Sequence, residues 1–503
     1  MKKTILTTLI GLSLTLQVFG AEGEMGYFVG ISTGTKLPTT TELAQKSNKK
    51  KVTKQTLPYK ENIYINGKAE LVEGTIEIRP SGAVDPLKPT GKYNEVYIVK
   101  AQSTDGTSVV NRNITLATQY IYHEANRQAT KTSTATKWNE TVISNGQTYT
   151  LDSKQSYFNK SIIEDYTPGV MYYRGDTNYK AIYSQGGGDV DSQTTVSVSG
   201  PIYGYDQTWA KTETQKLNIM VDSGANQYHI EHNPSLTVGK TLQYGVNEPD
   251  AISFQGNYKE LTKNEGMAMY HIRVGAKDLY EEDTQGAMNM PDHTSLEQLT
   301  IPYIPRIQGH FAESDIKKMY SMGIYTESPS TFNPNEVMTR EQYIKALVLA
   351  MKLPIPEIPK AKKATSKKPV EKPIFLDIAD TSPYYPYALA AYNEGLIGGG
   401  AFNPSAALTR EQAYTLVIRM IGLEHLGFHG SIYTPFVDSD KISSWAKRQI
   451  QAGVSLGLIQ SDENGYFLPQ RKVTKAEAAA ITNQMIDYLR YTLKKDYQEK
   501  IMQ

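Results

Sequence analysis

Apolar and polar residues alternate along the first half of the chain and take up helical spacing in the last third. Short alternating runs such as EVYIVKA (95–101) are rich in Tyr, Thr and Val and lie between turn residues, a pattern typical of antiparallel strands. The pairs Asp105-Gly106 and Asn145-Gly146 stand between such runs and predict tight hairpins. The pattern predicts one or two antiparallel, sandwich-like β domains over residues 59–275.

The helical part repeats one order of features three times. A short helical segment ends in Gly, a loop with Phe and Pro follows, and a Thr-x-x-Glu/Gln sequence opens a longer helix. The three openings are MTREQ (338–342), LTREQ (408–412) and VTKAE (473–477), and each predicts a capping box. Because similar units in series usually bury their apolar faces on one another, we expect the copies to form one unit.

Three further sets of residues recur at matching places in the copies. We expect the glycines to end the short helices, since glycine readily adopts the left-handed conformation of a helix stop. The sets are the loop phenylalanines Phe332, Phe402 and Phe467, the glycines Gly323, Gly395 and Gly457, and the leading aromatics Phe311, Tyr384 and Trp445.

A cation follows each capping threonine: Arg340, Arg410 and Lys475. A positive charge in the first turn opposes the helix dipole by roughly 0.3–1 kcal/mol. Its repetition suggests an anion held by the cation and by free helix N–H groups. The alternative is an internal carboxylate partner, such as Glu341 or an aspartate of a neighbouring copy, and the residues alone favour neither.

The composition narrows the class of protein. The N-terminus combines Lys2 and Lys3 with an apolar stretch over residues 4–19, which predicts a secretory signal over residues 1–20. Its removal leaves 51 basic against 52 acidic residues, so no general basic surface for nucleic acid is expected. There is no cysteine, which excludes disulfides and thiol chemistry. No covalent sorting signal is found near the C-terminus, so attachment to a surface would be non-covalent.

Several stretches of the helical part resemble the S-layer homology (SLH) domain family. The stretches are GHFAESDIKKMYSMGI (309–324), FNPNEVMTREQ (332–342) and FVDSDKISSWAKRQIQAGVSLGLI (436–459). The resemblance implies an all-α, pseudo-threefold unit whose grooves bind a secondary cell-wall polymer attached to peptidoglycan, often a pyruvylated glycan. Segments of the β region, such as GYDQTWAKTETQ (204–215), are similar to regions that precede such repeats in clostridial-type surface proteins.

The resemblance also implies polymer-binding residues, with departures from the family pattern. Lys475 replaces an arginine and cannot form a two-pronged bond to a carboxylate. Arg306 stands where the first copy would have an acid, so the number of working grooves is open. The implied binding residues are Arg340, Arg410, Lys475, Phe311, Tyr384, Trp445, Asp377, Asp438, Gly323, Gly395 and Gly457.

The remaining chemistry points away from catalysis. The run HIEH (229–232) in a strand places its first and last histidines on opposite faces, which does not suit a metal site. No nucleophile or acid pair can be placed across a cleft from the sequence. We therefore expect a secreted, non-enzymatic wall anchor without cofactor, metal or membrane insertion, whose β region is a structural or interaction module. Alternatives are an anchored glycan hydrolase and a lattice-forming S-layer subunit with neighbouring surface proteins as partners.

The expected organisation follows from these patterns. Residues 354–373 hold five prolines and six lysines and predict a solvated linker. The predicted segments are a signal peptide (1–20), a partly disordered segment (21–58), the β region (59–275), a connector (276–302), the first repeat (303–353), the linker (354–373), the second repeat (374–427), the third repeat (434–492) and a charged tail (493–503).

Overall fold

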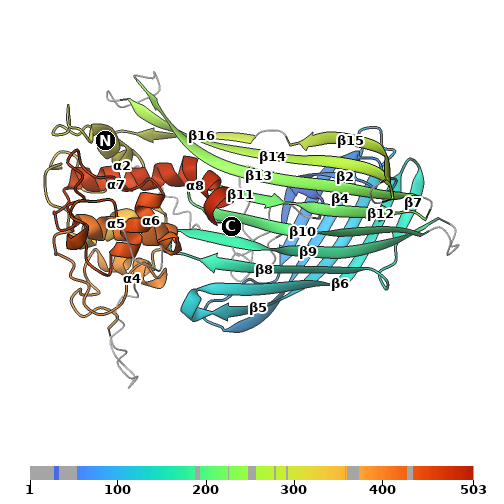
Figure 1. Cartoon of the computed structure of the whole chain (residues 1–503), viewed down its shortest axis with the longest axis horizontal. Coiled ribbons are helices and arrows are strands. Elements are labelled where there is room, and N and C mark those ends of the chain that lie inside the picture. Colours follow the sequence, from blue (N-terminus) through green and yellow to red (C-terminus); the bar gives the residue numbers. More distant parts are fainter. Residues whose placement is uncertain are drawn as a thin grey trace, which may run out of the picture.

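Strands and helices occupy opposite ends of the molecule (Figure 1). The structure, a computed structural model, describes residues 28–32, 54–186, 193–224, 226–246, 256–276, 279–290, 293–356, 358, 373–427 and 434–501. The predicted signal peptide and most of the predicted linker lie outside these residues. Within them, no helix has both the length and the apolar character needed to cross a membrane.

The strands form a single antiparallel sheet, so the expectation of a sandwich-like pair of sheets is wrong. Its order is β1-β2-β3-β4-β5-β6-β7-β9-β10-β11-β13-β14-β15, with β8, β12 and β16 beside this path. The strands are β1 (Gly30–Ser32), β2 (Gln55–Ile63), β3 (Glu70–Pro80), β4 (Thr90–Gln102), β5 (Val109–His123), β6 (Gln128–Ser144), β7 (Gln147–Leu151), β8 (Tyr157–Tyr166), β9 (Val170–Gln185), β10 (Gln193–Gln207), β11 (Ala210–Gln215), β12 (Leu217–Asp222), β13 (Gln227–Gly245), β14 (Asn257–Ala276), β15 (Leu279–Asn289) and β16 (His293–Thr300).

Two short strands share one long neighbour at three places in the sheet. β7 and β8 both pair with β6, β11 and β12 both pair with β13, and β15 and β16 both pair with β14. The last pair corrects the sequence analysis, because residues 276–302 were predicted as a connector. Their polar composition suits the end of a sheet that faces water on one side, where strands need few apolar residues.

The predicted hairpins are confirmed. Asn145 and Gly146 both have positive φ angles, 49° and 76°, as a type I′ turn between β6 and β7 requires. Gly106, with φ 72°, turns the chain between β4 and β5. The sheet curls, so that Tyr64 beyond β2 contacts His232 of β13 and Tyr270 of β14. One apolar cluster inside the curl therefore collects side chains from both ends of the strand order.

The helices pack in a cyclic order. The short helix of each repeat lies against the long helix of the preceding one: α4 against α3, α6 against α5, and α2 against α7, which closes the cycle. Each short helix is thus covered by a different copy, as expected from three similar units. The helices are α2 (Glu313–Ser321), α3 (Arg340–Ala350), α4 (Tyr385–Asn393), α5 (Arg410–Ile421), α6 (Lys447–Ser455), α7 (Lys475–Asp487) and α8 (Leu493–Asp496), with π-helical segments at Tyr488–Thr492 and Tyr497–Ile501.

The β region covers the C-terminal ends of all three long helices. Thr208 donates to the carbonyl of Met351 after α3 (2.6 Å). Tyr172 donates to the carbonyl of Ile421 at the end of α5 (2.8 Å). Gln207 donates to the carbonyl of Leu489 after α7 (2.9 Å). Because the last carbonyls of a helix lack partners within it, these bonds satisfy groups that would otherwise need water.

The last part of the chain joins this interface. Residues 493–503 were predicted as a charged tail, but as far as Ile501 they continue the helical path beyond α7. Leu493 and Tyr497 are buried, and the Tyr497 hydroxyl donates to the Tyr173 carbonyl at 3.0 Å. The prediction was based on the charged residues of this segment. Apolar side chains at helical spacing lie between them, and these side chains pack against the β region.

Candidate functional site

The long helices begin at the predicted capping boxes. Thr339 and Thr474 accept from the backbone of the third helical residue, and the side chain of that residue accepts from the threonine N–H. At Thr409 the return bond from its N–H to Gln412 Oε1 is 3.1 Å. The three cations therefore stand at the first helical position of α3, α5 and α7.

The backbone N–H groups of the first two residues of each long helix link the repeats. Arg340 N–H donates to the Ala406 carbonyl (3.0 Å), and Arg410 N–H donates to the Arg471 carbonyl (2.9 Å). Lys475 N–H donates to the Glu336 carbonyl (2.8 Å). The N–H group of the second residue of each long helix also donates to a carbonyl of another copy, in each case at 3.0 Å. The acceptors are Pro404, Pro469 and Pro334. The expectation that free helix N–H groups hold an anion is therefore wrong, because these groups join neighbouring copies.

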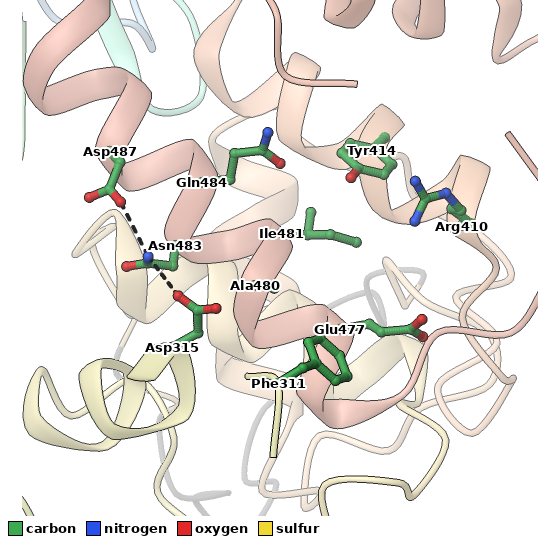
Figure 2. A pocket seen from close by; sticks show the side chains of 10 residues that line it. All are labelled: Phe311, Asp315, Arg410, Tyr414, Glu477, Ala480, Ile481, Asn483, Gln484 and Asp487. Carbon is green, nitrogen blue, oxygen red and sulfur yellow. Dashed lines mark hydrogen bonds between the residues drawn. The ribbon is translucent and has the colours of Figure 1, made fainter. Parts of the chain in front are cut away.

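A cleft of about 480 Å³ lies between three copies rather than within one. Phe311 comes from the start of the first repeat, Arg410 and Tyr414 come from α5, and α7 forms the floor. Figure 2 shows Arg410 and Tyr414 at one end and a polar group at the other, where Asn483 donates to Asp315 (2.9 Å) and Asp487 (3.2 Å). The cleft thus offers one cation and one exposed aromatic ring, together with amide groups and the carboxylates of Asp315, Glu477 and Asp487.

The cyclic packing brings leading aromatics near cations that belong to other copies. Tyr384 packs beside α3, where the charge of Lys475 acts on it and the Lys345 ammonium lies 5.7 Å from its ring centre. Trp445 stands before α6, which packs on α5. The remaining cation, Arg340, is influenced by Arg419 of α5. The cleft thus combines Phe311 with Arg410, and the charge of Lys475 acts on Tyr384. The same cyclic order predicts that Trp445 is paired with Arg340.

Each cation lies over the loop phenylalanine of the next copy. The distances from the charged group to the ring centre are 5.7 Å for Arg340 and Phe402, 5.3 Å for Arg410 and Phe467, and 5.8 Å for Lys475 and Phe332. All three rings are fully buried. The recurrence of these phenylalanines is visible in the sequence. Their contact with the cations is not, because it joins residues of different copies.

The electrostatic surroundings of the cations differ. Lys475 Nζ lies 2.7 Å from Glu327 Oε2 and 2.9 Å from Glu336 Oε2. Burial opposes the charge of Lys475, but the hydrogen bonds to both glutamates outweigh it and raise the pKa of this lysine. Burial and the nearby charge of Arg419 lower the pKa of Arg340, and Asp377 offsets only part of this. The internal partner that the sequence left open is thus present at Lys475.

Two of the predicted binding carboxylates hold a loop. Asp377 accepts from the N–H groups of Phe402 (2.7 Å) and Asn403 (2.6 Å), and these bonds lower its pKa. Asp438 accepts from those of Phe467 and Leu468, both at 2.9 Å. These contacts fit a structural role, and they do not support the prediction that either carboxylate binds the polymer.

The three glycines end the short helices as predicted. Gly323, Gly395 and Gly457 have φ angles of 70°, 76° and 72°, which side chains other than glycine rarely adopt. Their conformation explains why glycine stands at these positions without any contact to a ligand. Their predicted place among the binding residues stays a prediction.

Comparison with known proteins identifies the repeats. The family model of the S-layer homology domain matches residues 307–344, 374–413 and 435–479. The C-terminal region therefore carries three S-layer homology repeats, as the sequence predicted, and such repeats indicate anchoring at the cell surface.

Curated relatives match part of the chain. An endoglucanase of Bacillus sp. (strain KSM-635) is 31% identical over 118 residues, which are 23% of this chain and 12% of the relative. An amylopullulanase of Thermoanaerobacterium thermosulfurigenes is 26% identical over 184 residues, 35% of this chain and 9% of the relative. Exoglucanase XynX of Acetivibrio thermocellus is 26% identical over 184 residues, which are 35% of this chain and 15% of the relative. The chain thus spans at most 15% of the length of these relatives.

Proposed function

We propose that the three repeats form a pseudo-threefold unit that holds the protein on the cell wall by binding an acidic secondary wall polymer in the grooves between copies. The carboxylates of the polymer pair with the groove cations, and exposed Phe311 and Trp445 pack against sugar rings. The β region is a structural or interaction module displayed by this anchor.

The observation that carries the proposal is the state of two arginines. The Nε–H groups of Arg340 and Arg410 are buried and have no hydrogen-bond partner among the described residues. Within the described part of the chain, the one hydrogen bond of the Arg410 guanidinium goes to the Gln460 carbonyl, at 3.5 Å. A buried donor without a partner costs free energy. A ligand carboxylate in the groove would supply the missing partner and match the planar guanidinium with two hydrogen bonds.

A contact in the β region supports a role without catalysis. Glu61 and Glu140 face each other across Arg112, whose guanidinium lies 2.9 Å from Glu61 and 2.7 Å from Glu140. The Glu61 and Glu140 side chains are 3% and 0% exposed. Paired carboxylates that hydrolyse glycans must reach the substrate, and this pair is enclosed.

The test is binding of the full chain to isolated wall sacculi, before and after their acidic polymers are stripped. Arg410→Ala should weaken binding to untreated sacculi about ten- to a hundred-fold, since a charged hydrogen bond contributes roughly 1.5–3 kcal/mol. Arg79→Ala is the matched control, because it removes an exposed cation from β3. Equal binding to stripped and untreated sacculi would contradict the proposal, and release of reducing ends from the wall would favour the hydrolase alternative.

A further inference from the structure

The three grooves differ in whether the chain itself fills them. Glu327 and Glu336 both contact the ammonium of Lys475, a residue that is 3% exposed. The remaining side of the ammonium lies over the ring of Phe332. An ammonium has three N–H donors. Two are taken by carboxylates and the third side faces a ring, so none is open to a ligand.

The corresponding positions of the other copies carry no acid. Glu336 lies four residues after Phe332, and the residues four after Phe402 and Phe467 are Ala406 and Arg471. The backbone confirms the match, because the carbonyls of Glu336, Ala406 and Arg471 accept from the N–H groups of Lys475, Arg340 and Arg410.

Glu327, the other acid beside Lys475, also has no acidic counterpart in the other two copies. Glu327 lies four residues after Gly323, and the residues four after Gly395 and Gly457 are Gly399 and Ser461. Only the first repeat therefore places carboxylates at these two positions, and both reach the lysine that replaces an arginine.

We infer that Glu327 and Glu336 close the Lys475 groove to the wall polymer, so that the anchor binds through the Arg340 and Arg410 grooves. This inference rests on the proposed function. A polymer carboxylate would have to displace both glutamates from the ammonium, so it would replace existing ion pairs instead of adding a new one, and little free energy would be gained. The Arg340 groove has the opposite character, since a second cation, Arg419, acts on Arg340.

The test compares full-length variants in their binding to sacculi that carry the acidic polymer. Arg340→Ala and Arg410→Ala should each weaken binding about ten-fold or more. The triple variant Lys475→Met, Glu327→Gln, Glu336→Gln removes the whole ion pair without leaving an unpaired charge, and its binding should stay within about two-fold of the parent. A ten-fold loss in this variant, with unchanged circular dichroism, would overturn the inference and leave the proposed function standing. Unchanged binding in the arginine variants would overturn both.

A second test introduces a glutamate into a groove that is open, which should stop that groove from binding the polymer. Ala406→Glu places a carboxylate beside Arg340 at the position that Glu336 holds beside Lys475, and it should weaken binding as much as Arg340→Ala. Ser405→Glu is the matched control, because it adds the same charge at the exposed neighbouring residue. Binding of Ala406→Glu equal to that of Ser405→Glu would contradict the inference, and it does not depend on whether the lysine variants fold.

Discussion

Among single residues, burial determines at which pH a side chain gains or loses a proton. His232 of β13 is fully buried, accepts from the Tyr64 hydroxyl at Nδ1 (2.9 Å) and donates from Nε2 to the Val29 carbonyl (2.7 Å). Desolvation lowers its pKa to about 4. The sequence predicts only ordinary strand polarity here, whereas in the structure this histidine is a neutral link between the residue before β1 and β13.

The lowered pKa of His232 predicts sensitivity to acid. The unfolded chain binds a proton at this residue below about pH 6.5, while the folded state binds it only near pH 4. The free energy of unfolding should therefore be unaffected above pH 6.5 and fall by on the order of 3 kcal/mol as the pH drops to 4. His232→Gln removes the titrating group while its amide can still donate to the Val29 carbonyl, and it should remove this part of the pH dependence in urea unfolding. His123→Gln, at an exposed position, is the control, and an equal effect of both variants would contradict the prediction.

At the scale of elements, the loops before the long helices are held in a strained form. Leu468 has a φ angle of 58°, a conformation that is costly for leucine. The carboxylate of Asp438 offsets this by accepting from Leu468 N–H and from the adjacent Phe467 N–H. Because Phe467 is the ring beneath Arg410, the loop positions a groove residue without touching the ligand.

This loop predicts that Asp438 acts on stability rather than on recognition. Asp438→Asn loses a charged acceptor for two N–H groups and should lower the free energy of unfolding by about 1.5–3 kcal/mol. Asp440→Asn, at an exposed position two residues on, should change stability by less than about 0.5 kcal/mol. Thermal unfolding measures the difference. Sacculus binding of the folded Asp438→Asn protein should match the parent, and a ten-fold loss would restore Asp438 to the binding residues.

At the scale of the whole molecule, the β region completes the repeat unit. Two turns of the sheet, around Gly169 and Thr208, meet the ends of the three long helices, and Gly169 N–H donates to the Met420 carbonyl at 2.7 Å. Arg490 beyond α7 contacts Glu260 of β14 (3.3 Å) and lies 4.3 Å from the ring centre of Trp209. The groove cations stand at the opposite ends of the same helices. A polymer bound there would therefore hold the sheet in a fixed orientation.

This arrangement predicts one cooperative unfolding unit. The combined variant Tyr172→Phe, Gln207→Leu, Thr208→Val removes a hydrogen bond from each long helix end and should lower stability by roughly 0.5–1.5 kcal/mol per bond. Calorimetry should show one transition at a lower temperature. Tyr157→Phe, which removes an exposed hydrogen bond to Asn178, is the control. Two separate transitions, with the helical one unmoved, would show that the parts fold independently.

Local features of this protein could be predicted from its amino-acid sequence. Capping boxes, glycine helix stops and the Asn-Gly hairpin depend on residues close together in the chain, so their spacing revealed them. It also revealed the repeat, because three copies carry the same marks. Residues 276–302 and 493–501 were misjudged, since polar composition does not show which partner strand or surface an element will meet.

The residues that share a groove come together through contacts between copies that are far apart in the chain. Arg410 lies with Phe311, and Lys475 lies with Glu327 and Glu336, pairs that are 99, 148 and 139 positions apart in the chain. The spacing within one repeat does not reveal these partners, because cyclic packing sets each short helix against the long helix of another copy. Charge balance in a groove depends on distance and burial, which a linear pattern does not contain.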